Sequence, residues 1–129
     1  MLTGQCFCGA IRYETGERIR NQTLCHCTIC RRTSGAPAVA WFTVAAEDFR
    51  YTAGEPASLR SSSHGTRTFC PRCGTQLTFT DDATPHEIDV TTSSLAQPDI
   101  ALPRDHVFVA DALHWPDDLP RYQHSRSES

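Results

Sequence analysis

The cysteines of this chain are gathered in three short segments. The densest is Cys25-His26-Cys27-Thr28-Ile29-Cys30, and two pairs flank it, Cys6-Phe7-Cys8 and Cys70-Pro71-Arg72-Cys73. Thiolate ligands lie about 2.3 Å from a zinc ion, and closely spaced cysteines on tight turns reach that geometry readily. Four ligands close a tetrahedral structural site, whereas three leave one position for water or substrate. Seven cysteines therefore predict one closed zinc site and one open zinc site.

The two flanking pairs form the better four-ligand set. In the segment 70–74 the proline starts a turn and the glycine permits the left-handed backbone that ends it, as in a zinc knuckle. In a strand, both thiols of Cys6-Phe7-Cys8 would point to one side. The alternative is that all four cysteines are small buried apolar residues without a metal. We expect a structural zinc that ties the N-terminal segment to the middle of the chain, held by Cys6, Cys8, Cys70 and Cys73.

The central cluster has several interpretations from its residues alone. Cys27 and Cys30 would share one face of a helical turn, a spacing that also occurs in thiol redox pairs. Redox pairs of the thioredoxin type accompany a βαβ pattern, and no such pattern surrounds this segment. A second closed site would need a histidine as the fourth ligand, and the candidates are His26, His64, His106 and His114. The third interpretation is an open site with three cysteine ligands.

Short alternating segments predict β-strands around these clusters. The most apolar run, 38–44, is expected to be a central strand, with one of Trp41 and Phe42 in the core. Residues 17–22 are polar and are expected to form a loop or an edge strand. Further strands are expected at residues 10–13, 49–52, 58–62, 66–69, 76–80, 87–92 and 106–109.

The chain contains no helical pattern of any length and no internal repeat. We therefore predict a single all-β domain, a small zinc-bound arrangement of β-ribbons and sheets with short helical turns. This domain is expected to cover residues 1–120, followed by a mobile polar tail at residues 121–129.

Composition excludes several functions. The chain has 129 residues, a formal net charge of −3 and no lysine, so lysine Schiff-base chemistry is excluded and nucleic-acid binding is disfavoured. Arg31 and Arg32 either offset the negative charge of the central cluster, bind a substrate carboxylate or are solvated. The chain has no apolar run of 18 residues, so no membrane span is predicted, and the N-terminus lacks the pattern of a secretory signal. The odd number of cysteines then predicts reduced thiols or metal ligands in a cytoplasmic protein.

Several motifs together resemble the glutathione-dependent formaldehyde-activating enzyme family, which includes centromere protein V. Their order and spacing match from Gly4 to about Trp115. The segments that carry the resemblance are Gln5-Cys6-Phe7-Cys8-Gly9, Cys25-His26-Cys27-Thr28-Ile29-Cys30-Arg31, Ser34-Gly35 and Thr68-Phe69-Cys70-Pro71-Arg72-Cys73-Gly74.

The resemblance implies a compact β fold with two zinc ions. It implies that the two flanking pairs hold the structural zinc. It also implies that the second zinc has an open fourth position and that its ligands are the catalytic residues, Cys25, Cys27 and Cys30. The activity for which the family is named adds formaldehyde to glutathione, gives S-hydroxymethylglutathione and is classed as a carbon–sulfur lyase.

The expected partners are therefore a small thiol, such as glutathione, and a small aldehyde. Zinc stabilises a thiolate, so a thiol that takes the open position would lose its proton and become a nucleophile. The main rival interpretation is a non-catalytic, zinc-bound protein-interaction module. That interpretation predicts a filled fourth position and no affinity for thiols.

Overall fold

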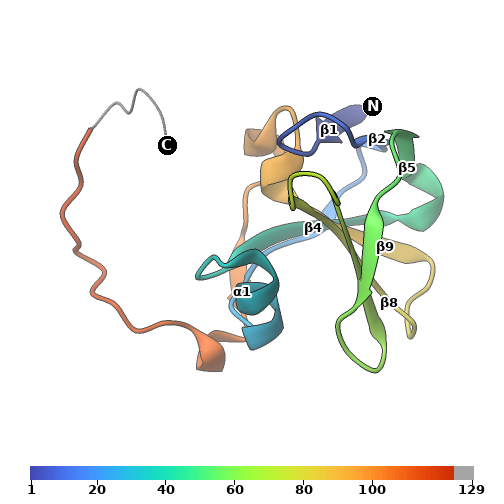
Figure 1. The fold of residues 1–129 in the computed structure, drawn as a ribbon. Helices are drawn as coiled ribbons and strands as arrows, with labels where there is room; N and C mark the ends of the chain where they lie inside the picture. The colour runs from blue at the N-terminus through green and yellow to red at the C-terminus, as the bar shows by residue number, and fades with distance from the viewer. Residues whose placement is uncertain (124–129) are drawn as a thin grey trace.

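The computed structural model describes residues 1–123, which fold into two β-sheets (Figure 1). The smaller sheet has the order β1-β2-β5, with strands at Leu2–Gln5, Arg12–Thr15 and Arg50–Ala53. The larger sheet has seven strands in the order β10-β3-β4-β9-β8-β7-β6. In that order the strands are Asp105–Val107, Arg20–Cys25, Val39–Ala45, Glu87–Thr91, Gln76–Asp81, Gly65–Phe69 and Ala57–Arg60. Strand β10 pairs parallel with β3, and the other pairings are antiparallel.

The predicted all-β class with short helical turns is confirmed, and strands β1, β2 and β3 differ from the sequence expectation. Strand β3 lies inside the larger sheet between β10 and β4, although its polar residues predicted a loop or an edge strand. Its polar side chains are accommodated because β10 contributes only three residues and because one face of the sheet lines a cavity. Strand β1 was not expected at all, and β2 begins at Arg12, two residues later than predicted.

Strand β4 separates the main core from a cavity. Successive side chains of a strand point to opposite faces of the sheet. Phe42 and Val44 are fully buried in the main core, while Trp41 and Thr43 on the other face line the cavity. The prediction that one of Trp41 and Phe42 belongs to the core is confirmed by Phe42 in the main core, and Trp41 is also buried, in a second cluster with Cys25 and Cys30.

Helix α1 (Thr28–Ser34) follows β3 directly and is capped at both ends. At its start, the sulfur of Cys27 accepts a hydrogen bond from the backbone N–H of Cys30 at 3.2 Å. At its end, Gly35 adopts a φ of 70° and donates its N–H to the carbonyl of Arg31 at 2.7 Å. The left-handed backbone of Gly35 is the usual signal that terminates a helix. These caps fix the orientation of the central cysteine segment relative to the sheet.

After the short 3₁₀ turn η4 (Val109–Asp111), the chain extends away from the sheets, as Figure 1 shows. Residues 112–123 contain no strand and no helix. Residues 124–129 of the predicted tail lie outside the described residues, and the domain boundary at residue 120 stays a prediction. Within residues 1–123, no helix has both the length and the apolar character that crossing a membrane requires.

Candidate metal centres and pocket

The two flanking cysteine pairs come together as one four-sulfur cluster. Its sulfur atoms all lie within 4.8 Å of one another, with 3.6 Å between Cys6 and Cys8 and 3.7 Å between Cys8 and Cys70. Zinc–sulfur bonds of about 2.3 Å in a tetrahedron place neighbouring sulfurs about 3.8 Å apart. The cluster of Cys6, Cys8, Cys70 and Cys73 therefore has spacings compatible with a tetrahedral zinc ion.

Backbone N–H groups surround this cluster. The sulfur of Cys70 accepts hydrogen bonds from the N–H groups of Arg72 and Cys73, both at 3.4 Å, as expected for a knuckle turn. Hydrogen bonds from the hydroxyl and the backbone of Thr75 lower the pKa of Cys73 to about 5. Donors to a sulfur favour its charged form. The predicted zinc knuckle thus has the local geometry that stabilises thiolate ligands.

The central segment brings its three cysteines together as a second cluster. Cys25 ends β3, Cys27 caps α1 and Cys30 lies in its first turn, and their sulfurs are within 4.8 Å of one another. Cys25 and Cys30 are buried, and Cys27 is half-buried. In the part of the chain that the structure describes, no histidine nitrogen or carboxylate oxygen joins this group. Three protein sulfurs with no fourth ligand fit a zinc ion that keeps one open position.

The candidate histidine ligands have other neighbours. The Nε2 atom of His26 lies 2.9 Å from Nδ1 of His106, and the two rings stack. The Nδ1 atom of His64 lies 3.4 Å from a carboxylate oxygen of Asp81. His114 is exposed on the segment that follows η4. None of the four belongs to the three-sulfur cluster.

Arg67, on β7, supplies the positive charge beside the second cluster. Its Nη1 and Nη2 atoms donate to the sulfur of Cys30 at 3.6 and 3.5 Å, and its Nε donates to Ser61 at 3.1 Å. Only 4% of Arg67 is exposed, because its guanidinium also packs over the rings of Trp41 and Phe79. A buried charge needs such partners. Arg67, rather than Arg31 or Arg32, therefore contacts a sulfur of the central cluster.

The same contacts change the acidity of a cluster thiol. The hydrogen bond with Cys25, followed by the positive charge of Arg67, lowers the pKa of Cys30 to about 5. Sequence reasoning missed the role of Arg67. The signal lies in β7, where alternation places Arg67 and the buried Gly65 on the same face of the sheet.

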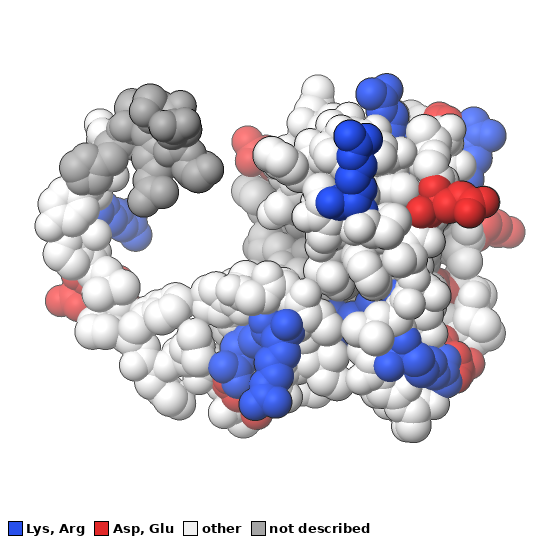
Figure 2. Space-filling view, in the orientation of Figure 1, with Lys and Arg blue, Asp and Glu red and all other residues white. Residues whose placement is uncertain are grey.

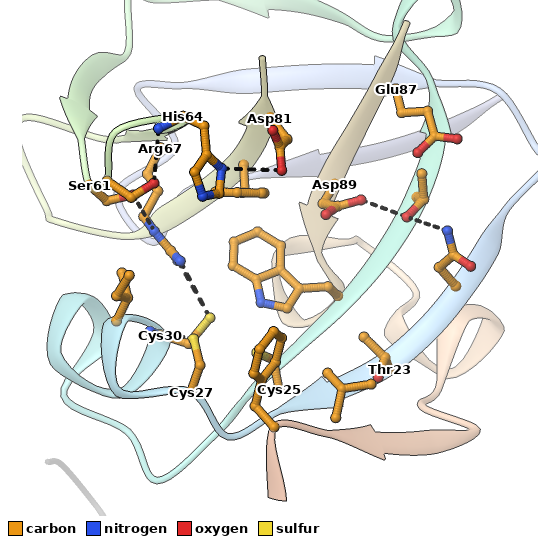
Figure 3. Close-up of a pocket in the computed structure, with 18 residues that line it drawn as sticks. Thr23, Cys25, Cys27, Cys30, Ser61, His64, Arg67, Asp81, Glu87 and Asp89 are labelled. Atoms are coloured by element: carbon orange, nitrogen blue, oxygen red, sulfur yellow. Dashed lines mark hydrogen bonds and ion pairs between the residues drawn. The ribbon is translucent and has the colours of Figure 1, made fainter. Parts of the chain in front are cut away.

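The second cluster opens onto a cavity of about 490 Å³ on one face of the larger sheet (Figure 3). All three cysteines and Arg67 line it, together with the apolar rings of Trp41 and Phe79. Three carboxylates, Asp81, Glu87 and Asp89, line another part of the same cavity. The four-cysteine cluster does not contribute to its walls. The chain thus combines a closed sulfur cluster with one that faces a cavity.

Asp89 is a second pocket residue that sequence reasoning missed. In β9, Ile88 and Val90 belong to or pack against the main core, so Glu87 and Asp89 face the cavity. This alternation of acidic and apolar residues was visible in the sequence as Glu87-Ile88-Asp89-Val90. It predicts a strand with one polar face, and only the topology shows that this face lines the same cavity as the cysteines.

Acidic and basic side chains are interspersed on the face shown in Figure 2. Arginine atoms gather over α1, which carries Arg31 and Arg32 in its last turn. Elsewhere on the surface, arginines pair with carboxylates, as in Arg20 with Glu87 at 2.8 Å and Arg50 with Glu14 at 2.7 Å. Exposed pairs of this kind contribute little to stability.

Comparisons with known proteins agree with this arrangement. A family model described as glutathione-dependent formaldehyde-activating enzyme matches residues 1–111. A Halomonas elongata protein, provisionally named a glutathione-dependent formaldehyde-activating enzyme, is 28% identical over 127 residues, covering 89% of this chain and 79% of that protein. A crystal structure of a Rhodobacter sphaeroides protein has a similar fold, with a TM-score of 0.63 and 24% identity over 81% of this chain and 99% of that one.

Fold and site together define a small β-sheet domain with two clusters of cysteines that could hold metal ions, one of which faces a cavity. Within that class, the chain belongs to the glutathione-dependent formaldehyde-activating enzyme family. The resemblance inferred from the cysteine motifs is confirmed.

Proposed function

We propose that this protein is a zinc-dependent enzyme of the carbon–sulfur lyase type that joins a small thiol, glutathione or a similar one, to formaldehyde or a similar small aldehyde. The observation that carries the proposal is the three-cysteine cluster on the wall of a 490 Å³ cavity. Family membership and the name of the Halomonas elongata relative support the choice of substrates. The free cysteines suit a reducing compartment, which favours the cytoplasm as its location.

The cysteines have different roles in this proposal. The four-sulfur cluster would hold a structural zinc, and the catalytic zinc would be held by Cys25, Cys27 and Cys30. A zinc ion with an open position lowers the pKa of an incoming thiol and so supplies a nucleophilic thiolate. Arg67 holds the sulfur of Cys30 in place and offsets part of the negative charge that three thiolates carry.

The reaction adds the S–H of the thiol across the C=O of the aldehyde. A carbon–sulfur bond forms, the π electrons move to oxygen, and the proton lost by sulfur ends on that oxygen. Trp41 and Phe79 provide apolar walls beside the cluster. Such walls exclude water and keep the two reactants close to each other, which lowers the barrier of a bimolecular step.

The test is the rate of C–S bond formation and cleavage at equilibrium. ¹³C-formaldehyde and glutathione would be mixed with zinc-loaded protein, and exchange with S-hydroxymethylglutathione would be followed by NMR exchange spectroscopy. We expect exchange faster than the spontaneous rate for the wild type and the spontaneous rate for Cys27→Ser. A protein with two bound zinc ions that leaves the exchange rate unchanged would contradict the proposal and favour a non-catalytic interaction module.

A further inference from the structure

The cavity has two chemically different ends, and strand register sets the distance between them. Cys25 pairs with Val39 and Asp89 pairs with Thr43, and both partners lie on β4. These two positions of β4 are four residues apart, about 13 Å along the strand. Cys25 and Asp89 lie on the strands on either side of β4, about 10 Å apart across the sheet, so their backbones are about 16 Å apart. Figure 3 shows the labelled cysteines below Asp89 and Glu87 in the view.

Two of the three cavity carboxylates already have partners. Glu87 accepts a hydrogen bond from Arg20 at 2.8 Å, which lowers the pKa of Glu87. Asp81 lies 3.4 Å from the ring nitrogen of His64. Glu87 is therefore paired with an arginine, and Asp81 has a histidine ring as its neighbour.

Asp89 differs from both. Its Oδ1 accepts a hydrogen bond from the hydroxyl of Thr43 at 2.5 Å, and Thr43 in turn accepts one from the side chain of Asn21 at 3.3 Å. Among residues 1–123, no arginine, lysine or histidine nitrogen forms an ion pair with Asp89. Burial raises the pKa of Asp89. A positive charge beside this buried carboxylate would favour its charged form, so the position is complementary to a positively charged ligand.

The cavity also lacks a free positive charge. Arg67 is the one arginine among the described residues that line it, and its nitrogens contact Cys30 and Ser61. A substrate carboxylate would therefore find no unengaged guanidinium in the cavity. The electrostatics of the cavity favour a cationic group at the end away from the cysteines.

We propose, on the basis of the proposed function, that the cavity takes a thiol that also carries a protonated amine, with its sulfur at the three cysteines and its ammonium at Asp89. Glutathione is one thiol of this class. Eight covalent bonds join its sulfur to its amino nitrogen, about 10 Å when extended. An ammonium–carboxylate hydrogen bond adds about 3 Å. Contact of the ligand sulfur with the cysteine sulfurs adds about 4 Å, so the extended reach is about 17 Å, close to the backbone separation of the two ends.

The same separation excludes direct proton transfer by Asp89 at the reacting carbon. A general acid must come within about 3 Å of the atom that it protonates, directly or through one water. Asp89 is therefore a binding residue in this proposal, and its removal should affect affinity more than the chemical step.

Calorimetry with two non-reactive ligands tests this proposal on zinc-loaded protein. The ligands are S-methylglutathione, which has no S–H, and its N-acetyl derivative, which has no ammonium. We expect the wild type to bind the free amine about tenfold more tightly, as a charged hydrogen bond requires. Asp89→Asn should bind the two ligands with nearly equal affinity. The matched control Glu87→Gln, whose carboxylate is already paired with Arg20, should keep the preference.

The outcomes separate this proposal from the proposed function. A wild type that binds both ligands equally, or an Asp89→Asn variant that keeps the preference, would overturn the ammonium site even if C–S exchange occurs. An amine preference that depends on Asp89 would support the site even if exchange stays at the spontaneous rate, in which case the proposed function alone fails. The comparison of ligands on the wild type does not depend on the folding of any variant.

Discussion

The two sulfur clusters use the same ligand type and differ in what surrounds it. The four-cysteine cluster joins segments far apart in the chain, since Cys8 and Cys70 are 62 residues apart. Backbone N–H groups of the knuckle point at its sulfurs, and it does not line the 490 Å³ cavity. A metal there would close a long loop of the chain, which favours the folded state.

The three-cysteine cluster comes from a single segment of six residues. A metal there would close only a short loop and contribute less to the stability of the fold. Unlike the four-cysteine cluster, it contacts a buried arginine and lines a cavity. From the number of cysteines and their separation in the sequence, we expect a structural role for the first cluster and a reactive role for the second. Four variants can break or sharpen this distinction.

The largest effect is expected for Cys70→Ser, which removes a ligand from the four-sulfur cluster. Structural zinc binds zinc-finger peptides with about 10–16 kcal/mol, comparable with the whole stability of a domain. We expect the variant to lose its zinc there and to show no cooperative thermal unfolding by circular dichroism. Cooperative unfolding at the wild-type temperature would contradict the structural role of this cluster.

Cys27→Ser should abolish activity while the fold persists. Serine is a good N-cap residue, so the start of α1 keeps its cap after the sulfur is lost. We expect one zinc per chain, exchange at the spontaneous rate and a loss of unfolding free energy of about 1–2 kcal/mol. The measurements are metal analysis, exchange NMR and thermal unfolding. Loss of cooperative unfolding would show that both clusters are structural.

Arg67→Gln should weaken retention of the second zinc. Three thiolates and a divalent cation carry a net charge of −1, which Arg67 offsets through its contacts with Cys30. Charged hydrogen bonds contribute about 1.5–3 kcal/mol, so we expect a loss of affinity of roughly tenfold or more. Competition with a chelator measures this affinity. The control is Arg60→Gln, because Arg60 is exposed and pairs with Asp82 outside the cavity, and equal affinity in both variants would contradict the role of Arg67.

The smallest effect is expected for the stability of Asp89→Asn. Desolvation raises the pKa of Asp89, and the nearby Glu87 and Asp81 add to this rise while Arg20 and Thr43 oppose it. Between the unfolded and folded pKa values the native state binds more protons, so this residue makes stability fall as pH rises through that interval. We expect the variant to unfold at a slightly higher temperature at pH 7 and to lose this pH dependence. A lower unfolding temperature at pH 7 would contradict the assigned cost of the buried charge.

Sequence analysis predicted the parts of the molecule that local spacing controls. The knuckle at 70–74 and the helical turn that carries Cys27 and Cys30 follow from turn chemistry within a few residues. The grouping of Cys6 and Cys8 with that knuckle could be inferred because four ligands close a site. The general β class followed from the alternating segments.

Contacts between distant strands could not be predicted in the same way. Arg67 contacts Cys30 only because the fold places the Arg67 side chain of β7 and the cysteine segment after β3 in the same cavity. The seven-stranded order, with β3 inside the sheet, has no local signal in the polar residues of that strand. Asp89 likewise becomes part of the cavity through its pairing with Thr43. The positions of these residues in the site depend on the order of the strands, which local sequence patterns do not specify.

The central claim is that one cluster is closed and the other is open to a thiol. The most direct measurement is zinc per chain under reducing conditions, followed by the rate of zinc release to a mild chelator with and without glutathione. We predict two zinc ions, one inert and one labile, with release of the labile ion slowed by glutathione. Two equally inert ions, or a labile ion that glutathione does not protect, would contradict the open site, and a protein without zinc would contradict both sites.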